Sequence, residues 1–229
     1  MHYFSQAVLE AIQLIFKFDP EVYIIAWTSL KLSLTATVIA SIFGVFIGIS
    51  VATTEFTGKR LLQHLLNTLM AMLTVMIGLI FYGLLSRKGP LGDLGLLYSE
   101  TAVIIGEAFL ILSIIMNLTI TAVQSADDRL IITLKTLGAS SSQLIFPVLS
   151  ELRYVILAAI ITGFGRAIGE VGAAMMLGGN IQGVTRTMTT AIALETSKGE
   201  VELGVALGIL LLLFAFIVNM LFQSLKNKY

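Results

Sequence analysis

The stretch Gly163-Phe164-Gly165-Arg166-Ala167-Ile168-Gly169-Glu170-Val171-Gly172 (GFGRAIGEVG) places two opposite charges and four glycines inside a long apolar run. A charge at the centre of a membrane-spanning helix costs about 2.5–3.5 kcal/mol on insertion scales. Such charges are tolerated where they face the interior of a helix bundle or a water-filled path. The stretch therefore predicts a helix that is packed inside a membrane protein.

Two spacings within this region bear on its role. Arg166 and Glu170 lie four residues apart, which is one turn on one face of a helix, so they can form an ion pair. Gly165, Gly169 and Ala173 also repeat every four residues and form a stripe of small residues that lets helices approach closely. Two interpretations stay open: a structural ion pair that fixes helix packing, or a charged pair at a gate or along a path.

The composition of the whole chain indicates the same environment. The 229 residues are 57% hydrophobic and 12% charged, with a mean hydropathy of +0.95, whereas soluble domains are about a quarter charged. The 14 basic and 14 acidic residues balance, so nothing in the charge indicates a nucleic-acid partner. The absence of cysteine excludes disulfides and thiolate metal sites.

Five stretches are apolar and long enough to cross a bilayer, which takes about 20 helical residues. They are residues 24–53, 66–86, 101–124, 154–177 and 203–222. Asp19-Pro20-Glu21 is typical of a helix start, because it offers an N-cap, a proline at the first position and an acid in the first turn. The sequence predicts an all-α integral membrane protein with five spans in a transmembrane domain over residues 20–222.

Residues 1–19 carry a different pattern. Apolar residues recur every three or four positions with polar residues between them: Phe4, Val8, Ile12, Ile15 and Phe18. This pattern predicts an amphipathic helix that lies in the membrane interface. An amphipathic helix packed on protein is the alternative. The single lysine comes late, at Lys17, and no cleavage site follows, so the segment does not resemble a signal peptide.

An odd number of spans places the two termini on opposite sides of the membrane. If the N-terminus is outside, the inner segments 54–65, 125–153 and 223–229 hold seven lysines and arginines, against five in the outer segments. Because cytoplasmic loops carry an excess of lysine and arginine, this orientation is favoured. Residues 223–229 then form a cytoplasmic tail.

Two segments between the spans show helical patterns of their own. Residues 125–153 read as helix, glycine, helix around Gly138, with Asp127 and Asp128 where carboxylates suit a helix N-terminus. The segment suits either a cytoplasmic docking surface or an ordinary amphipathic connector. The outer loop, residues 178–202, contains a short apolar helix from Met188 to Leu194. This helix either caps a pathway from outside or only packs as a re-entrant element.

Two further charges lie within the predicted spans. Lys31 stands a turn or two inside the first span, where it either snorkels to the outer interface or raises the local concentration of an anion. Glu107 is isolated in the third span. It is either protonated or paired with Arg166 or Lys31.

Motifs for catalysis and for metal binding are absent from the sequence. No Gly-x-x-x-x-Gly-Lys-Ser/Thr loop occurs, so no nucleotide-binding site is expected on this chain. His2 and His64 stand alone, without the spacing of metal ligands. No nucleophile–base arrangement is present, so we expect neither an enzyme nor a cofactor or metal on this chain.

Two stretches resemble the permease subunits of binding-protein-dependent ABC importers for oxyanions. They are Thr136-Leu137-Gly138-Ala139-Ser140 and residues 163–173. The run from Leu177 to Gly199 is similar to the tungstate branch in particular. The resemblance covers nearly the whole chain and is strongest from residue 133 to 200.

The resemblance implies a homodimer of the type I importer fold (MetI-like) in the plasma or inner membrane of a prokaryote. The segment 125–153 would be the coupling loop, which docks on a separate cytoplasmic ABC ATPase dimer that holds ATP and Mg²⁺. An extracytoplasmic binding protein would deliver tungstate, with molybdate or sulfate as alternatives. The implied ATPase-coupling residues are Thr136, Leu137, Gly138, Ala139, Ser140 and Ser141. The implied pathway or gate residues are Arg166, Gly169, Glu170, Gly172 and Lys31.

The sequence also departs from the family pattern. Ile132-Thr133-Leu134 replaces the usual Glu-Ala-Ala ahead of Gly138, which removes an acidic contact with the ATPase. The three prolines, Pro20, Pro90 and Pro147, lie outside the spans, so no proline-kinked gate is expected. Two other classes remain: a non-transporting membrane scaffold, and an ion-coupled carrier that uses Glu107 and Glu170. The absence of paired discontinuous segments in two halves counts against the carrier.

Overall fold

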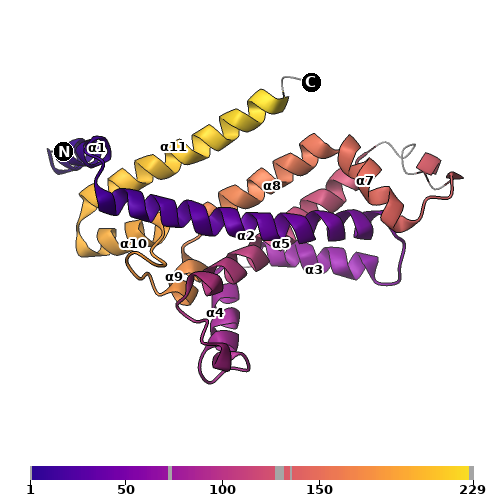
Figure 1. Ribbon diagram of the computed structural model, residues 1–229, viewed down its shortest axis with the longest axis horizontal. Coiled ribbons are helices and arrows are strands. Elements are labelled where there is room, and N and C mark those ends of the chain that lie inside the picture. Colours follow the sequence, from indigo (N-terminus) through magenta and orange to yellow (C-terminus); the bar gives the residue numbers. More distant parts are fainter. Residues whose placement is uncertain (1, 72–73, 127–131, 135, 227–229) are drawn as a thin grey trace. The chain divides into compact units, whose positions relative to one another are not determined.

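The computed structural model describes residues 2–71, 74–126, 132–134 and 136–226, and all regular structure within these ranges is helical (Figure 1). The elements are α1 (His2–Phe16), α2 (Pro20–Thr53), α3 (Lys59–Ala71), α4 (Thr74–Leu85), the short 3₁₀ helix η1 (Gly92–Leu94), α5 (Glu100–Gln124), α7 (Ser141–Glu151), α8 (Arg153–Ile168), α9 (Gly172–Gly178), α10 (Met188–Lys198) and α11 (Val201–Lys226).

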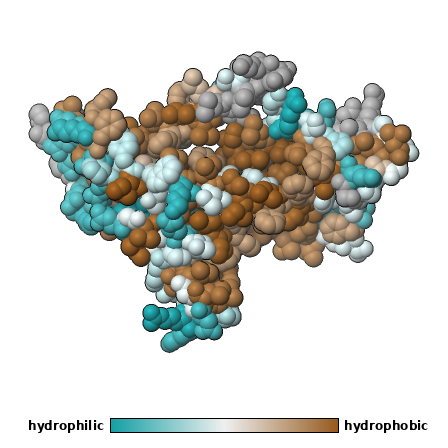
Figure 2. Space-filling model, in the orientation of Figure 1, coloured by the Kyte–Doolittle hydropathy of each residue, from teal (hydrophilic) through white to brown (hydrophobic). Residues whose placement is uncertain are grey.

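Three helices, α2, α5 and α11, are each long and apolar enough to cross a membrane. They cover the predicted spans 24–53, 101–124 and 203–222, although α11 continues to Lys226, beyond the predicted end at residue 222. Figure 2 shows hydrophobic residues over most of the visible face. Up to five spans result if each of two bent helix pairs counts as one crossing, so the count of five stays a prediction.

Two of the predicted spans are not continuous helices. Residues 66–86 divide between α3, which ends at Ala71, and α4, which begins at Thr74, with 72–73 outside the described residues. Residues 154–177 divide between α8, which ends at Ile168, and α9, which begins at Gly172. Glycine is a poor helix former, and two glycines flank this second break. The prediction of one helix over residues 154–177 is therefore wrong.

The chain forms two compact units. The first comprises Met1–Ala36, Leu73–Glu107 and Ala167–Tyr229. The second comprises Thr37–Met72 and Ala108–Arg166. The division falls within α2 and α5, so both of these helices contribute residues to each unit.

Within the first unit, α1 and α10 pack on α11, and α4 packs on α9 (Figure 1). Leu32, Val103 and Ala174 form one of its buried clusters. Ala11 of α1 is fully buried, whereas Phe16 is largely exposed. The packing of α1 on α11 agrees with the alternative of an amphipathic helix packed on protein, and an interfacial position for this helix stays a prediction.

The second unit holds α3 and α7 together with the C-terminal parts of α2 and α5 and with α8 as far as Arg166. Gly48 allows a close approach between α2 and α5, because a Cβ there would lie 2.9 Å from Thr119 Cβ. The amide of Asn117 donates a 2.6 Å hydrogen bond to Asn67 Oδ1 and so joins α5 to α3. Helix α7 meets α8 at Leu152 with a bend of 84°.

A pair of glycines on α4 tests how tightly α4 packs on α9. A Cβ at Gly78 would lie 2.9 Å from Ala173 Cα, whereas a Cβ at Gly83 would meet nothing within 4 Å. We expect Gly78→Leu to destabilise the protein by about 1–3 kcal/mol through overpacking. Gly83→Leu is the matched control, and we expect it to leave the thermal unfolding midpoint of the purified protein unchanged or slightly raised. Equal midpoints for the two variants would contradict this packing.

Candidate functional site

Three buried acids mark the polar interior of the first unit. Glu107 and Glu170 are each 2% exposed, and Glu195 is 3% exposed. They come from α5, from the break between α8 and α9, and from α10. Because a buried carboxylate is costly unless it is hydrogen-bonded or paired, the partners of each one define the site.

Glu170 organises the break between α8 and α9. Its Oε1 accepts a 2.9 Å hydrogen bond from the backbone N–H of Ala173, in the first turn of α9. Its backbone carbonyl accepts a 2.6 Å hydrogen bond from Thr189 Oγ1 of α10. A carboxylate at a helix N-terminus satisfies orphan N–H groups and complements the helix dipole. Glu170 therefore starts a new helix instead of continuing the old one.

Glu107 lies near this break on α5. Ser33 of α2 is hydrogen-bonded to its carboxyl group, and the Glu170 carboxylate acts on it by charge repulsion. Its Oε2 has no hydrogen-bond partner among the described residues. The sequence left Arg166 and Lys31 as candidate partners, but Lys31 instead forms an ion pair with Glu100, with Nζ 2.5 Å from Oε2.

Lys31 lines a pocket of about 480 Å³ together with Trp27, Glu100 and Gly183. Its side chain is 47% exposed. Because Glu100 balances its charge, the attraction of Lys31 for a free anion is reduced. The arrangement agrees better with a lysine that reaches out of the span than with an anion trap.

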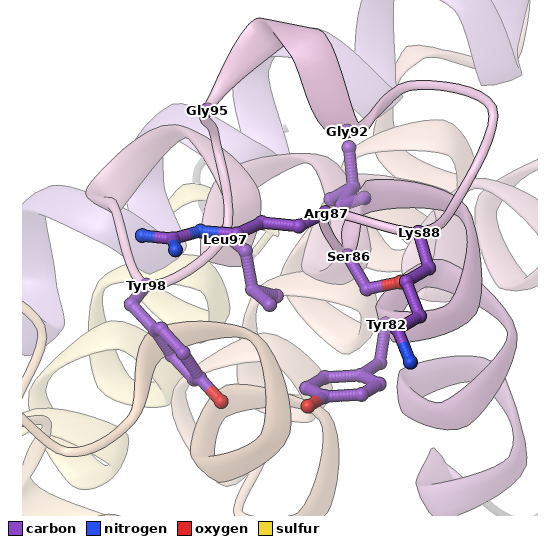
Figure 3. A pocket seen from close by; sticks show the side chains of 9 residues that line it. Tyr82, Ser86, Arg87, Lys88, Gly92, Gly95, Leu97 and Tyr98 are labelled. Atoms are coloured by element: carbon purple, nitrogen blue, oxygen red, sulfur yellow. The ribbon is translucent and has the colours of Figure 1, made fainter.

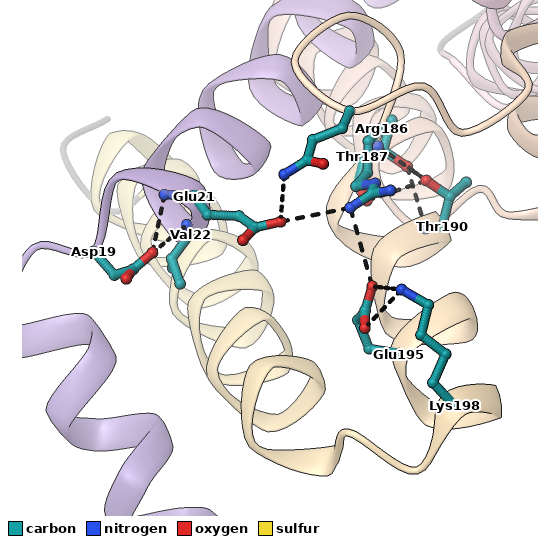
Figure 4. Close-up of polar contacts among 9 residues, drawn as sticks. Asp19, Glu21, Val22, Arg186, Thr187, Thr190, Glu195 and Lys198 are labelled. Atoms are coloured by element: carbon teal, nitrogen blue, oxygen red, sulfur yellow. Dashed lines mark hydrogen bonds and ion pairs between the residues drawn. The ribbon is translucent and has the colours of Figure 1, made fainter.

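A network of charges ties the outer loop to the start of α2 (Figure 4). Arg186 Nη1 lies 3.5 Å from Glu21 Oε1 and 4.0 Å from Glu195 Oε1. Lys198 Nζ donates to both oxygens of Glu195, at 3.0 and 3.2 Å. Gln182 Nε2 donates to Glu21 Oε1 at 2.8 Å. Sequence reasoning missed this network, because Gln182 and Arg186 lie in a loop without periodicity and the members are up to 177 positions apart (198 − 21).

The start of α2 is formed as the sequence predicts. Asp19 Oδ1 accepts hydrogen bonds from the backbone N–H of Glu21 at 2.9 Å and of Val22 at 3.3 Å (Figure 4). Asp19 is thus the N-cap, Pro20 the first helical residue, and Glu21 an acid in the first turn. Glu21 also forms the ion pair with Arg186. The N-cap and the outer network therefore share the first turn of α2.

The short helix predicted from Met188 to Leu194 is confirmed as part of α10, which extends to Lys198. Thr187 caps it, since its Oγ1 accepts from the Thr190 N–H at 3.3 Å. The Met188 N–H donates to Ser29 Oγ of α2 at 2.6 Å. With the bond from Thr189 to Glu170, α10 is fixed to both α2 and the α8–α9 break.

The predicted pathway residues are not on one helical face. Arg166 is exposed on α8, whereas Glu170 is buried beyond the end of that helix, so the i, i+4 spacing on a continuous helix is a wrong prediction. Gly169 lies exposed in the break. Gly172 packs on α4, where a Cβ would lie 2.8 Å from Val75 Cγ2. A role of these residues in a pathway or gate stays a prediction.

Only part of the small-residue stripe Gly165, Gly169 and Ala173 packs against another helix within the described residues. Ala173 is buried, and its Cα packs where Gly78 of α4 has no side chain. A Cβ at Gly165, in contrast, would meet nothing within 4 Å. The start of the stripe at Gly165 is therefore exposed and does not pack on the described part of the chain.

The predicted ATPase-coupling segment forms a helix end, a turn and a helix start. Gly138 adopts φ +83° in this turn, and the Ala139 N–H donates to the Leu134 carbonyl at 3.0 Å. Ser140 and Gln143 form a capping box at the start of α7, and Ser141 is the first residue of that helix. Thr136 Oγ1 donates to the Thr133 carbonyl at 2.8 Å. Asp127 and Asp128 lie outside the described residues.

Exposed apolar side chains surround this turn. Leu137 is 79% exposed, Phe146 is 70% exposed and Ile132 is 58% exposed. A soluble surface rarely carries several large apolar residues close together without a partner. The role of this segment as a docking surface stays a prediction.

Comparison with known proteins places this chain in a family. Residues 20–229 match the family described as "Binding-protein-dependent transport system inner membrane component". The chain belongs to this family and is thus a membrane component of a transport system that works with a binding protein.

Two relatives and one solved structure extend this comparison. The tungstate uptake system permease protein TupB of Peptoclostridium acidaminophilum is 39% identical over 228 residues, which cover 100% of both chains. A protein of the same name from Campylobacter jejuni is 39% identical over 173 residues, 76% of this chain and 72% of that one. A chain of the structure titled "Crystal structure of an amino acid ABC transporter with histidines" superposes with a TM-score of 0.68 at 14% identity, covering 94% of this chain and 97% of that one. This last likeness shows the fold alone.

Proposed function

We propose that this chain is the membrane-spanning permease subunit of an ATP-driven importer for tungstate. The observation that carries the proposal is the likeness to a tungstate uptake permease along the entire length of both chains. Molybdate or sulfate is the alternative, because tetrahedral dianions differ little in charge and hydrogen bonding. Relatives named for molybdenum and sulfate transport are less similar to this chain.

In this proposal two copies of the chain enclose the pathway, with the N-terminus outside and the C-terminus in the cytoplasm. The binding protein delivers the oxyanion at the outer face, where α10 and the Arg186 network fix the loop 178–202. ATP and Mg²⁺ are held by a partner ATPase dimer. The chain itself binds neither, and its task is to alternate the access of the pathway between the two sides of the membrane.

Force from the ATPase would enter through residues Thr136 to Ser141. The exposed side chain of Leu137 supplies apolar contact area for a groove on the ATPase. Because Gly138 and the capping box fix the turn, and α7 meets α8 at 84°, a push on α7 is passed to α8 as a tilt. The break at Glu170 lies directly after α8 in the chain, where such a tilt would change the pathway.

Arg166, Gly169, Glu170 and Gly172 would line or gate that pathway. An exposed arginine on a membrane helix needs water or a second protein surface around it. The second copy of the chain would supply this surface, since the start of the small-residue stripe at Gly165 is also uncovered. Glu107, which the Glu170 carboxylate repels, would be a supporting group that does not need to carry an ion.

Tungstate uptake into proteoliposomes tests the proposal against the carrier and scaffold alternatives. The vesicles hold this chain with its ATPase, and loaded binding protein is added outside. We expect uptake that requires ATP inside, stops with a hydrolysis-deficient ATPase, and survives ionophores that dissipate ion gradients. Uptake that persists without ATP and collapses with the ion gradient would support a carrier. A verified complex that takes up no oxyanion would support a scaffold.

An exposed leucine in the coupling turn offers a more local prediction. We expect Leu137→Asp to reduce co-purification of the ATPase at least 10-fold, because a carboxylate placed in an apolar contact is desolvated without a partner. Leu94→Asp is the matched control, since Leu94 is also largely exposed but lies in η1, on the opposite side of the membrane in the proposed orientation. Equal recovery of the ATPase with both variants would contradict the docking role of Leu137.

A further inference from the structure

The loop between α4 and α5 encloses a pocket of about 570 Å³ that is separate from the buried acids (Figure 3). Its polar lining comes from Tyr82 and Ser86 at the end of α4, Arg87 and Lys88 in the loop, and Tyr98 before α5. We propose that this pocket binds a tetrahedral oxyanion, either free or as the phosphate of a lipid headgroup.

The charge of the pocket fits a dianion. Arg87 and Lys88 are adjacent and exposed, and neither forms an ion pair within the described ranges. No carboxylate is among the lining residues. Figure 3 shows Arg87 extending toward the side of Tyr98 and Lys88 toward the side of Tyr82. A guanidinium can contact two oxygens of one oxyanion, while an ammonium supplies a point charge on another.

The two tyrosines add neutral donors at the base of the pocket. Figure 3 shows the hydroxyl groups of Tyr82 and Tyr98 pointing toward the space between the two rings, and the neighbouring Tyr82 hydroxyl raises the pKa of Tyr98 above its ordinary value. Tyr98 is therefore protonated at neutral pH. A neutral phenol hydroxyl can donate a hydrogen bond to a ligand. An anion between the two cations thus finds a further hydrogen-bond donor.

The pocket is held in shape before any ligand arrives. A Cβ at Gly89 would overlap the carbonyl oxygen of Gly83, so the loop closes tightly on the end of α4. Tyr98 adopts φ +66°, an unusual conformation for a bulky residue. Its N–H donates to the Leu177 carbonyl at 2.8 Å, and its ring packs directly over Gly179. Such preorganisation reduces the entropy lost when a ligand is bound.

The site is distinct from the proposed transport activity, and only its location on the outer face depends on the proposed orientation. A free oxyanion would be held there either before it enters the pathway or as an effector that remains bound at this site. A lipid phosphate would instead anchor the loop at the membrane surface. Both present the same tetrahedral group of anionic oxygens, so binding experiments with and without lipid separate them.

The test measures binding of radiolabelled phosphate and of tungstate to the purified, delipidated permease–ATPase complex, without the binding protein. We expect the double variant Arg87→Gln, Lys88→Gln either to lose one bound anion per permease chain or to bind it with a dissociation constant at least 10-fold higher. Tyr82→Phe should weaken binding by a smaller factor, and its folding is checked by thermal unfolding. Lys17→Gln removes an exposed charge elsewhere and should leave binding unchanged.

The outcomes separate the two sources and the two proposals. Displacement of the bound anion by added phosphatidylglycerol, but not by neutral lipid, identifies the lipid phosphate as the occupant. Persistence of the bound anion in phosphatidylglycerol identifies a free oxyanion. Unchanged binding stoichiometry and affinity in the double variant would overturn the site. The binding assay needs neither ATP nor transport. A failure of the importer proposal would therefore change the result of the uptake experiment and not that of the binding assay.

Discussion

Gly138→Leu is expected to abolish the stimulation of ATP hydrolysis by substrate in the assembled transporter, a loss of at least 10-fold, while the permease still folds. Gly138 adopts φ +83°, where a residue with a side chain is strained by roughly 1–2 kcal/mol. A Cβ there would meet no atom within 4 Å, so the strain comes from the backbone alone. The turn relaxes to another angle and misplaces Leu137 relative to α7. The measurement is ATPase activity with and without loaded binding protein.

Gly58→Leu is the matched control for this prediction. Gly58 has φ +105°, and a Cβ there would likewise meet no atom within 4 Å, but the residue lies in the loop between α2 and α3. We expect this variant to suffer the same kind of backbone strain and to keep substrate stimulation. If both variants lost stimulation equally, general strain would explain the result. If Gly138→Leu were stimulated normally, the coupling role of this turn would be refuted.

Glu170→Leu is expected to destabilise the permease by about 2 kcal/mol or more. The leucine cannot accept the hydrogen bond from the Ala173 N–H, and a buried unsatisfied N–H costs about 1–3 kcal/mol in addition to the lost cap interaction. Glu170→Gln keeps an acceptor oxygen and removes the charge that repels Glu107. We therefore expect the glutamine variant to unfold at a temperature close to that of the original protein.

Thermal unfolding of the two Glu170 variants in the same detergent decides between hydrogen bonding and charge. A low midpoint for the leucine variant alone supports the role of Glu170 in starting α9. Equally low midpoints for both variants would show that the negative charge of Glu170 stabilises the protein, as expected if Glu170 forms an ion pair. Uptake measured on the stable glutamine variant then tests separately whether that charge belongs to the pathway.

Much of the fold could be predicted because local signals agree with the final structure. The apolar length of residues 24–53 and the cap at Asp19 together define α2. The pattern around Met188 defines α10, and the glycine at position 138 defines the turn before α7. In each case the residues that decide the structure lie within a few positions of one another.

The break between α8 and α9 could not be predicted in the same way. Residues 154–177 are apolar or glycine throughout except for Tyr154, Thr162, Arg166 and Glu170, so their apolar length favours one helix. The break is stabilised by Thr189, which is 19 positions away and bonds the Glu170 carbonyl. A tertiary contact therefore overrides the local pattern, and Arg166 and Glu170 do not lie on one continuous helix. Their pairing stays a prediction.

The candidate site was predicted least well for residues whose contact partners are distant in the sequence. Lys31 meets Glu100 from 69 positions away, and Glu107 meets Ser33 and Glu170 from two other segments. A single sequence gives no signal for such pairs. Glycine and charge patterns indicated that the region around residue 170 is special, but only the fold shows which atoms it joins.

The most direct test of the importer proposal is ATPase activity of this chain reconstituted with its ATPase and binding protein, titrated with tungstate, molybdate and sulfate. We expect tungstate to stimulate hydrolysis at the lowest concentration of the three, with molybdate and sulfate acting only at higher concentrations. Stimulation at a lower concentration by molybdate or sulfate would contradict tungstate as the substrate. No stimulation by any of them, in a complex shown to be assembled, would contradict an oxyanion importer.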